Sequence, residues 1–397
     1  MSEKNSTDIY FYGLNTPKYK RENEKYYKDN TELVQDTERK FTFQMFKDTV
    51  KSEVQRLINK PYENIVVLAG AGASIVEDNS KGKTVLQLFN DIKDYLDENK
   101  GNLYTFDDFR SKKIIDEDDK NLENILSVLI KAVILFEGIE NEEFSNFIDI
   151  DKLKRTVEEI KQRIYQDTSN YKFDNSCKHD ILIKKLSGRL HNDSRLNIVT
   201  TNYDRLFEGA AADLGFWIFD GFSFSNPPVF DADIFDWKLV KDIPNSKTQE
   251  LEYRSNMINL LKIHGSVDWE MNEEEKLSKV LTDKQEGIDP VMIFPSSEKY
   301  MESYQEPYFP LMTKFQELLR KPNTLFMTVG FSFADNHIFE MILQSIKHNN
   351  SLSTLITDYT LEDGKKNQNW KKLSELSKLY DIHFLKGALN GDLLDYL

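Results

Sequence analysis

Short apolar runs alternate along the chain with longer stretches in which apolar residues recur at helical spacing. The short runs are rich in β-branched residues and lie at 64–69, 198–199, 260–263, 291–294, 324–329, 355–360 and 382–385. Continuous apolar runs are typical of strands covered on both faces, as in parallel sheets. Their alternation with helical patterns predicts an α/β fold, a Rossmann-like doubly wound parallel sheet.

One long block departs from this alternation. Between residues 85 and 191 the apolar positions form four helical stripes, beginning near Leu88, Leu122, Leu153 and Ile181, and no run with strand character intervenes. This block predicts a large all-helical insertion. The α/β domain would then consist of residues 61–84 and 192–397.

The N-terminal part has a different character. Residues 1–36 are polar, charged and rich in tyrosine, which predicts an arm ordered only on a partner. Residues 38–59 carry apolar side chains at helical spacing, and Pro61 closes that pattern. Residues 1–60 are therefore predicted to be an N-terminal extension of arm and helix. A further acidic stretch, 268–275, predicts a solvated loop or helix start.

Composition narrows the class of protein. The 397 residues are 39% hydrophobic and 30% charged, which is enough apolar content for a sizeable core. The net charge of −15 argues against direct nucleic-acid binding, since that needs a basic face. The most apolar run, 125–136, is too short to span a bilayer and contains Lys131. We therefore expect no membrane segment.

The cysteine content bounds the chemistry and the compartment. Cys177 is the single cysteine, so neither a disulfide framework within the chain nor a cysteine-rich zinc site can form. The first residues lack the apolar core of a signal peptide. These features predict a cytoplasmic protein with no metal site.

The first apolar run leads into Gly70-Ala71-Gly72-Ala73-Ser74. Glycines at such a turn let the backbone approach a pyrophosphate, which exposed N–H groups can bind. The pattern departs from a dehydrogenase fingerprint, because Ile75 stands where a third glycine is needed and no acid ends a second strand. A simple glycine turn between strand and helix remains the alternative.

The second run ends in a polar cluster that contains Thr201, Asn202 and Asp204. In an open α/β sheet, groups at the carboxyl end of a strand face the ligand site. An amide and a carboxylate two residues apart suit such a site. The alternative is that both residues cap the helix that follows.

Two later runs also end in functional side chains. His264 and Gly265 follow 260–263, and a histidine can exchange a proton near neutral pH; a hydrogen-bonded core histidine is the alternative. Gly330 and Ser332 follow 324–329 and could meet a phosphate or a ribose hydroxyl. Beyond them, Asp335 and Asn336 read as a helix cap, and His337 is the one other histidine of interest. In a doubly wound sheet all these strand ends converge on one site.

Taken in order, Gly-Ala-Gly-Ala-Ser, Thr-Asn-Tyr-Asp, His-Gly-Ser and Gly-Phe-Ser-Phe resemble the sirtuin-like superfamily, and most of all its bacterial NAD-consuming antiviral branch. The resemblance covers about 64–74 and 195–346 and extends to the final strands. It implies that Asn202 orients the attacking water, that Asp204 holds the nicotinamide carboxamide and that His264 is the general base. The residues implied to bind NAD are Gly70, Ala71, Gly72, Ser74, Thr201, Gly330 and Ser332.

Two departures from the deacylating sirtuins shape the predicted activity. Those enzymes usually have glutamine before the asparagine, where this chain has Thr201, and they carry a four-cysteine zinc module that one cysteine cannot supply. The resemblance therefore implies an NAD⁺ hydrolase. Its substrate is NAD, its products are nicotinamide and ADP-ribose, and no metal is needed.

The resemblance also implies a biological setting, namely NAD depletion during phage infection. Such an enzyme must be restrained in healthy cells, so we expect a homo-oligomer or a partner. The chain length and the N-terminal arm resemble sirtuin-like subunits that pair with a HerA-type hexameric ATPase. Three alternatives stay open: an NAD or ADP-ribose sensor without turnover, an NAD-dependent protein deacylase, and an α/β protein unrelated to NAD.

Overall fold

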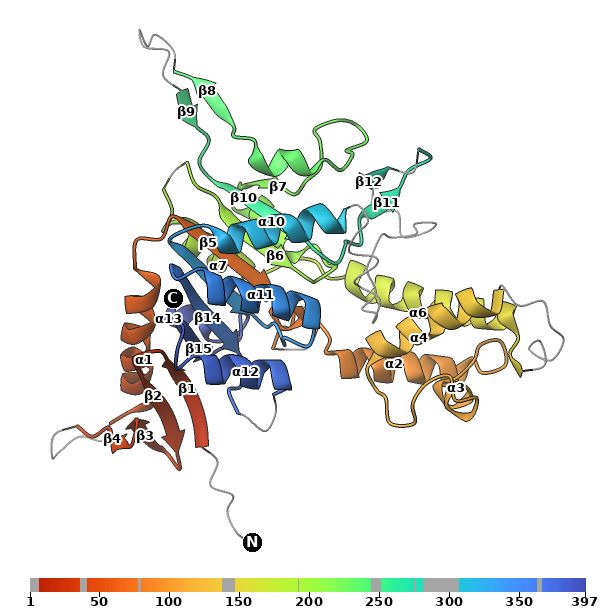
Figure 1. Ribbon diagram of the computed structural model, residues 1–397, viewed down its shortest axis with the longest axis horizontal. Coiled ribbons are helices and arrows are strands. Elements are labelled where there is room, and N and C mark those ends of the chain that lie inside the picture. Colours follow the sequence, from red (N-terminus) through yellow and green to blue (C-terminus); the bar gives the residue numbers. More distant parts are fainter. Residues whose placement is uncertain are drawn as a thin grey trace.

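The computed structural model describes residues 7–35, 41–77, 80–137, 147–191, 193–243, 251–274, 276–280, 307–362 and 366–397. Its centre is a sheet whose described strands run in the order β4-β3-β2-β1-β15-β14-β13-β5-β6-β10-β7 (Figure 1). The parallel strands are β5 (Asn64–Ala69), β6 (Leu196–Thr200), β7 (Trp217–Phe219), β10 (Met257–Lys262), β13 (Thr324–Val329), β14 (Leu352–Asp358) and β15 (Ile382–Lys386).

The order of these strands makes the sheet doubly wound. From β5 the chain adds β6, β7 and β10 on one side, then crosses back and adds β13, β14 and β15 on the other. The direction reverses between β5 and β13, which pair in parallel from Asn64–Thr324 to Ala69–Val329. Ligands of such sheets bind at the carboxyl ends of the strands where the order reverses. The predicted fold class is confirmed.

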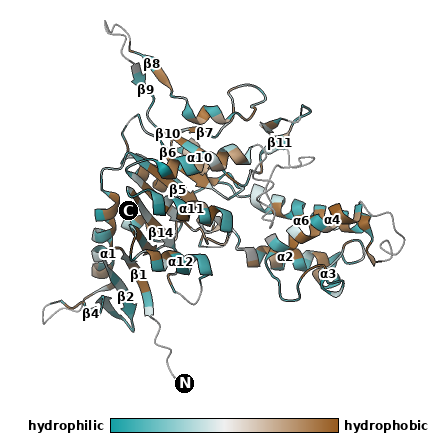
Figure 2. Ribbon diagram, in the orientation of Figure 1, coloured by the Kyte–Doolittle hydropathy of each residue, from teal (hydrophilic) through white to brown (hydrophobic). Residues whose placement is uncertain are grey.

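Helices cover both faces of the sheet, and the alternation along β5 shows how. Ile65 and Val67 belong to a core with α1 (Phe43–Ile58), α7 (His179–Ser187), α8 (Leu206–Asp213) and α13 (Leu393–Tyr396). Val66 and Leu68 belong to a second core with α10 (Tyr308–Arg320), α11 (Asn336–His348) and α12 (Gln368–Leu376). Successive strand side chains point to opposite faces, so a continuous apolar run serves two cores. The central strands carry the hydrophobic colours in Figure 2.

The N-terminal segment is not the tail that its polarity predicted. β1 (Thr7–Gly13) pairs antiparallel with β15, and β2 (Thr16–Glu22), β3 (Lys25–Lys28) and β4 (Thr31–Glu32) extend the sheet further. Tyr10, Tyr19 and Tyr26 are buried and contact the Phe46 ring of α1 edge-on or stacked. The tyrosines thus form a core against α1, and β1 covers the edge that β15 would otherwise expose.

The helical block comprises α2 (Val85–Glu98), α3 (Phe106–Ser111), α4 (Leu122–Glu137) and α6 (Ile150–Ser169). These helices share a hydrophobic core of their own, and they stand apart from the sheet in Figure 1. The fourth predicted stripe behaves differently. Leu182, Ile183 and Leu186 of α7 belong to the core under the sheet. By packing, α7 belongs with the α/β domain although it falls within the predicted insertion.

Small elements surround the sheet. They are the hairpin strands β8 (Val240–Asp242) and β9 (Leu251–Tyr253), the pair β11 (Trp269–Met271) and β12 (Leu277–Lys279), and the 3₁₀ helices η1 (Ala71–Ala73) and η2 (Ala232–Asp236). The acidic stretch 268–275 was predicted to be solvated, but Asp268 is buried and β11 follows it directly. The predicted strand at 291–294 lies outside the described residues.

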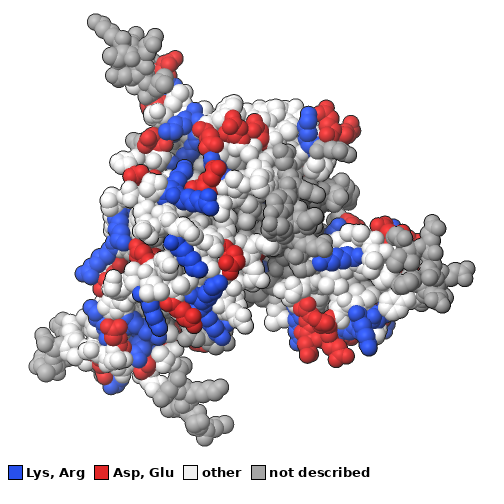
Figure 3. Space-filling view, viewed as in Figure 1, with Lys and Arg blue, Asp and Glu red and all other residues white. Residues whose placement is uncertain are grey.

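Basic and acidic side chains are mixed over the visible face of the sheet domain (Figure 3). No helix among the described residues has the length and apolar character needed to cross a membrane.

Candidate active site

Two glycine turns meet at the point where the strand order reverses. The Gly70 N–H donates to the Val329 carbonyl at 3.0 Å, and the Gly72 N–H donates to the Gly330 carbonyl at 3.0 Å. A Cβ on Gly72 would lie 2.8 Å from the Gly330 Cα, and a Cβ on Gly330 would lie 2.4 Å from the Gly72 carbonyl carbon. Gly330 also has a φ of +58°. The two turns therefore pack backbone against backbone, and any side chain would separate them.

The turn after β13 uses its side chains locally. Ser332 is exposed, its hydroxyl accepts from the Ala334 N–H at 3.3 Å, and its carbonyl accepts from Asn367 at 2.8 Å. Phe333 has a φ of +57°, unusual for a bulky residue, and its buried ring contacts Phe331 and Trp370 edge-on. The turn is thus fixed by packing, with Ser332 on its outer side.

Asn202 is tied to the glycine turn rather than to a helix. Its Nδ2 donates to the Gly70 carbonyl at 2.9 Å and to the Ser74 hydroxyl at 2.7 Å. Its backbone N–H donates to the Thr200 hydroxyl at 3.0 Å. Because both amide hydrogens are used, the carbonyl oxygen Oδ1 is the atom through which Asn202 could accept from a ligand. The alternative that Asn202 caps a helix does not describe its contacts.

Asp204 contacts both the start of α8 and the glycine turn. One carboxylate oxygen accepts from the Leu206 N–H at 3.1 Å, at the start of α8, as a capping residue would. The other accepts from the Ser74 hydroxyl at 2.6 Å. Ser74 therefore links Asn202 to Asp204, and all three side chains are buried. Neighbouring Thr201 is half-buried, and its N–H donates to the Ala69 carbonyl at 3.1 Å.

Lys262, which sequence reasoning missed, holds the turn at Tyr203 and Asp204 in place. Its side chain is 2% exposed, and its Nζ donates to the carbonyls of Tyr203 and Asp204 and pairs with Glu208 at 3.0 Å. Burial raises the pKa of Glu208, and the positive charge of Lys262 opposes that rise. The signal in the sequence was a lysine inside an apolar strand, since a buried charge is stable only when paired.

Further charges lie beside this pair. Burial disfavours the charged form of Asp268, but Lys279 and Lys262 lower its pKa below the ordinary value. Ser266 donates to the same carboxylate, and Arg205 lies 3.6 Å from it. Lys279 in turn pairs with Asp220. The turn that carries Asn202 and Asp204 therefore rests on a paired charge cluster drawn from β10, β12 and α8.

His264 lies two residues after the end of β10 and is buried. Its Nε2 lies 3.6 Å from a carboxylate oxygen of Asp335, and both side chains are about one-tenth exposed. Asp335 is also the N-cap of α11, as predicted, because it accepts from the N–H groups of His337 and Ile338. His337 itself is exposed on the first turn of α11.

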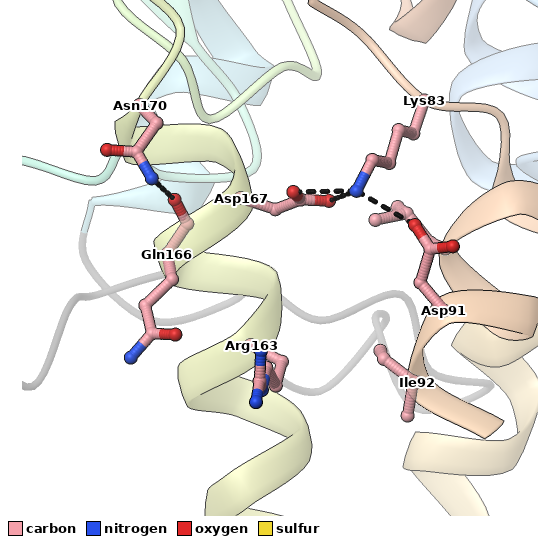
Figure 4. A pocket seen from close by; sticks show the side chains of 8 residues that line it. Lys83, Asp91, Ile92, Arg163, Gln166, Asp167 and Asn170 are labelled. Atoms are coloured by element: carbon pink, nitrogen blue, oxygen red, sulfur yellow. Dashed lines mark hydrogen bonds and ion pairs between the residues drawn. The ribbon is translucent and has the colours of Figure 1, made fainter. Parts of the chain in front are cut away.

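The loop that follows the glycine turn is anchored on three sides. Asn390 donates to the carbonyls of Ala73 at 3.1 Å and Ile75 at 2.8 Å. Lys81 pairs with Asp174 at 2.6 Å. Lys83 reaches between Asp91 of α2 at 2.8 Å and Asp167 of α6 at 2.7 Å, beside a cavity of about 230 Å³ (Figure 4). These anchors connect the glycine turn to the helical block and to the C-terminus, and sequence spacing did not reveal them.

One more buried histidine lies near the site. His179 of α7 is fully buried and its ring meets Phe207 edge-on. Within the part of the chain that the structure describes, neither ring nitrogen has a hydrogen-bond partner. Burial lowers its pKa to about 4, so the ring is neutral at pH 7. Among the described residues, no three His, Cys, Asp or Glu side chains gather so that they could hold a metal ion.

Residues 196–378 match the family model of the SIR2-like domain. The matched residues run from β6 to the residues just after α12, so they include Asn202, Asp204, His264 and Gly330. The glycine turn at 70–74, the N-terminal strands and the helical block lie outside them. The match supports a sirtuin-like protein.

Solved structures of Sir2 proteins are similar to the chain in outline. A Sir2 enzyme is 12% identical, with 83% of this chain and 98% of the Sir2 chain covered and a TM-score of 0.35. Sir2Tm bound to a propionylated peptide is 13% identical, with 82% and 96% covered and a TM-score of 0.33. No curated protein matches the sequence significantly.

Proposed function

We propose that this protein is an NAD⁺ hydrolase that cleaves the bond between nicotinamide and ribose to give nicotinamide and ADP-ribose. The observation that carries the proposal is the chain of hydrogen bonds from Asn202 through Ser74 to Asp204. It joins a glycine turn fit for a diphosphate to an amide and a carboxylate at the next strand end. The SIR2-like match, which begins at β6 and includes Asn202 and Asp204, supports NAD as the ligand.

In this proposal, different residues of the site contact different parts of NAD. The turn formed by Gly70, Ala71 and Gly72 would lie against the diphosphate, because glycines let phosphate oxygens approach the backbone closely. The Gly70 and Gly72 N–H groups already donate to the Val329 and Gly330 carbonyls, so the Ala71 N–H is the group of this turn that would donate to the phosphate. Ser74 would also contact the diphosphate, and Thr201, next to Asn202, would contact NAD as well. Gly330 and Ser332 would line the adenosine side, where Ser332 is exposed.

The chemistry needs few groups. When the glycosidic bond breaks, its electron pair goes to the nicotinamide nitrogen, and positive charge builds on the anomeric carbon. Asp204 would hold the carboxamide, and the Oδ1 of Asn202 would orient a water molecule. The water oxygen forms the new bond to the anomeric carbon, and its proton passes to His264. General-base assistance of this kind contributes roughly 10²–10⁴ in rate.

The setting of the activity is part of the same proposal and rests on the resemblance. The protein would act in the cytoplasm as an NAD-depleting effector in antiphage defence. It would be a homo-oligomer restrained or activated by a HerA-type hexameric ATPase. The ion pairs of Lys81 and Lys83 connect the glycine turn to the helical block, and such control would act through these contacts.

Product analysis tests the proposal. Purified protein is incubated with NAD⁺, with and without the ATPase and with and without an acyl-lysine peptide, and the products are separated by chromatography. We expect nicotinamide and ADP-ribose without peptide, and loss of both in His264→Ala with folding retained. Nicotinamide release only with the peptide would identify a deacylase instead. Tight NAD binding without products would identify a sensor.

A further inference from the structure

The two oxygens of the Asp335 carboxylate face different partners. Oδ1 accepts from the backbone N–H groups of His337 at 2.9 Å and Ile338 at 3.2 Å. Oδ2 lies 3.6 Å from the Nε2 of His264. One side chain therefore caps α11 and meets the histidine that follows β10. The contact spans the point where the strand order reverses, since β10 and β13 lie on opposite sides of β5.

Capping alone does not require this placement. Asp149 caps α6 and Asp231 caps η2 with the same kind of hydrogen bond, and both residues are exposed. Only 9% of the Asp335 side chain is exposed. Burying a carboxylate costs free energy unless its charge is paired. A cap at this position could be served as well by asparagine, which is neutral.

The helix adds a second reason for a negative charge here. The N-terminus of α11 carries a partial positive charge, which disfavours a protonated imidazole nearby. A carboxylate between the helix end and His264 reverses that effect. Water screens the contact little, because both side chains are about one-tenth exposed.

We propose that Asp335 is a positioning residue for His264, holding its imidazole through Nε2 and stabilising the imidazolium that forms when His264 takes a proton. The inference rests on the proposed function. With Nε2 protonated and facing Asp335, Nδ1 carries the lone pair that receives the proton from water. A carboxylate that orients a catalytic histidine in this way fixes its tautomer and does not itself become protonated.

The other acids of neighbouring elements have partners of their own. Asp204 accepts from Ser74 and the Leu206 N–H, and Asp268 accepts from Ser266 and lies beside Arg205. The cations Lys262 and Lys279 belong to the cluster with Glu208 and Asp220. Asp335, by contrast, is joined to His264 by an ion pair.

The test is a titration of the six histidines by NMR in the full-length protein labelled at histidine. His264 is assigned by comparison with His264→Gln. The key variant is Asp335→Asn, which keeps the helix cap and removes the charge. Loss of a close carboxylate should lower the pKa of His264 by about one unit. Asp149→Asn is the matched control, because it removes the charge of an exposed cap and should leave the His264 pKa in place.

Enzyme kinetics give a second readout. Turnover that needs neutral His264 falls at acidic pH, so the acidic limb of the kcat/KM profile should move about one unit lower in Asp335→Asn. An unchanged His264 pKa in Asp335→Asn, or an equal shift in Asp149→Asn, would overturn the proposal. These results are separate from the proposed function, because the NMR titration reads His264 whether or not NAD⁺ is cleaved. A protein without turnover would contradict the function and leave the titration decisive for the pair.

Discussion

The side-chain amide of Asn202 donates to the hydroxyl of Ser74 at 2.7 Å, although the two residues lie 128 positions apart in the chain. The Ser74 hydroxyl in turn donates a hydrogen bond to the Oδ2 of Asp204, with 2.6 Å between the two oxygens. The hydroxyl thus sets the orientation of both candidate catalytic groups. It also binds the end of β6 to the turn after β5, which makes these two strand ends one structural unit.

Replacing Ser74 with alanine should separate these groups. Asn202 would keep its bond to the Gly70 carbonyl, but Asp204 would lose its buried donor. We expect kcat/KM for nicotinamide release to fall at least about tenfold, and the free energy of unfolding to fall by about 1–2 kcal/mol. Ser345→Ala is the control, since that buried hydroxyl donates within α11, to the Met341 carbonyl. Equal kinetics in the two variants would contradict the role of Ser74.

The close approach of the two glycine turns predicts an unequal effect of two alanine substitutions. Gly330 and Gly215 both have positive φ, +58° and +68°. A Cβ at Gly330 would lie 2.4 Å from the Gly72 backbone, whereas a Cβ at Gly215 would have no atom of the described residues within 4 Å. Gly215→Ala should cost about 1–2 kcal/mol of strain and leave NAD⁺ affinity unchanged. Gly330→Ala should cost more and weaken NAD⁺ binding, measured by calorimetry. Equal losses in both variants would show that the approach is unimportant.

The pair Lys262–Glu208 predicts a clear stability pattern. Lys262→Met leaves the carboxyl of Glu208 buried and unpaired, so we expect a loss of about 3–5 kcal/mol in urea unfolding. The double change Lys262→Met with Glu208→Leu should recover part of that loss, because it removes the unpaired carboxyl but leaves the Tyr203 and Asp204 carbonyls without the donor that Lys262 supplies. Lys276→Met breaks an exposed pair with Glu274 and should cost less than about 1 kcal/mol. A double variant no more stable than Lys262→Met would refute the pairing argument.

The burial of His179 predicts a dependence of stability on pH. Its pKa is about 4 in the folded protein, against an ordinary value of 6.5. Between these values the unfolded chain binds a proton that the folded chain does not. The free energy of unfolding should therefore fall as the pH drops through this window, by up to about 1.4 kcal/mol per pH unit.

His179→Phe should remove this part of the pH dependence while keeping the edge-on contact with Phe207. Urea unfolding at several pH values measures the slope. The exposed residue His191 provides the control, and His191→Gln should leave the slope unchanged. A slope in His179→Phe equal to that of the unaltered protein would contradict the assignment.

The spacing of apolar and polar residues along the chain predicted the central strands and the polar residues at their carboxyl ends. Apolar runs such as 324–329 marked strands buried on both faces, and the polar residues after them marked the end of the sheet where Asn202 and His264 lie. The N-terminal strands were missed because β2 buries a single side chain, Tyr19, and so produces no apolar run. Its order comes from pairing with β1 and packing on α1, which sequence spacing does not reveal.

The supporting residues of the site were missed for a similar reason. Asp335 reads as a helix cap, which it is, and only the fold brings its second oxygen to His264. Asp268 reads as part of a solvated acidic stretch, but Lys262 and Lys279 from other strands make its burial tolerable. Local sequence identifies side chains that suit a ligand, whereas the charges that hold them are supplied across long distances in the chain.

The most direct test of the central claim is nicotinamide release from NAD⁺ by the purified protein, measured by chromatography in the presence and absence of a HerA-type ATPase. We predict equal amounts of nicotinamide and ADP-ribose from the unaltered protein without any acyl peptide, and none from Asn202→Ala with the same circular dichroism spectrum. Intact NAD⁺ under both conditions, or undiminished release by Asn202→Ala, would contradict the account.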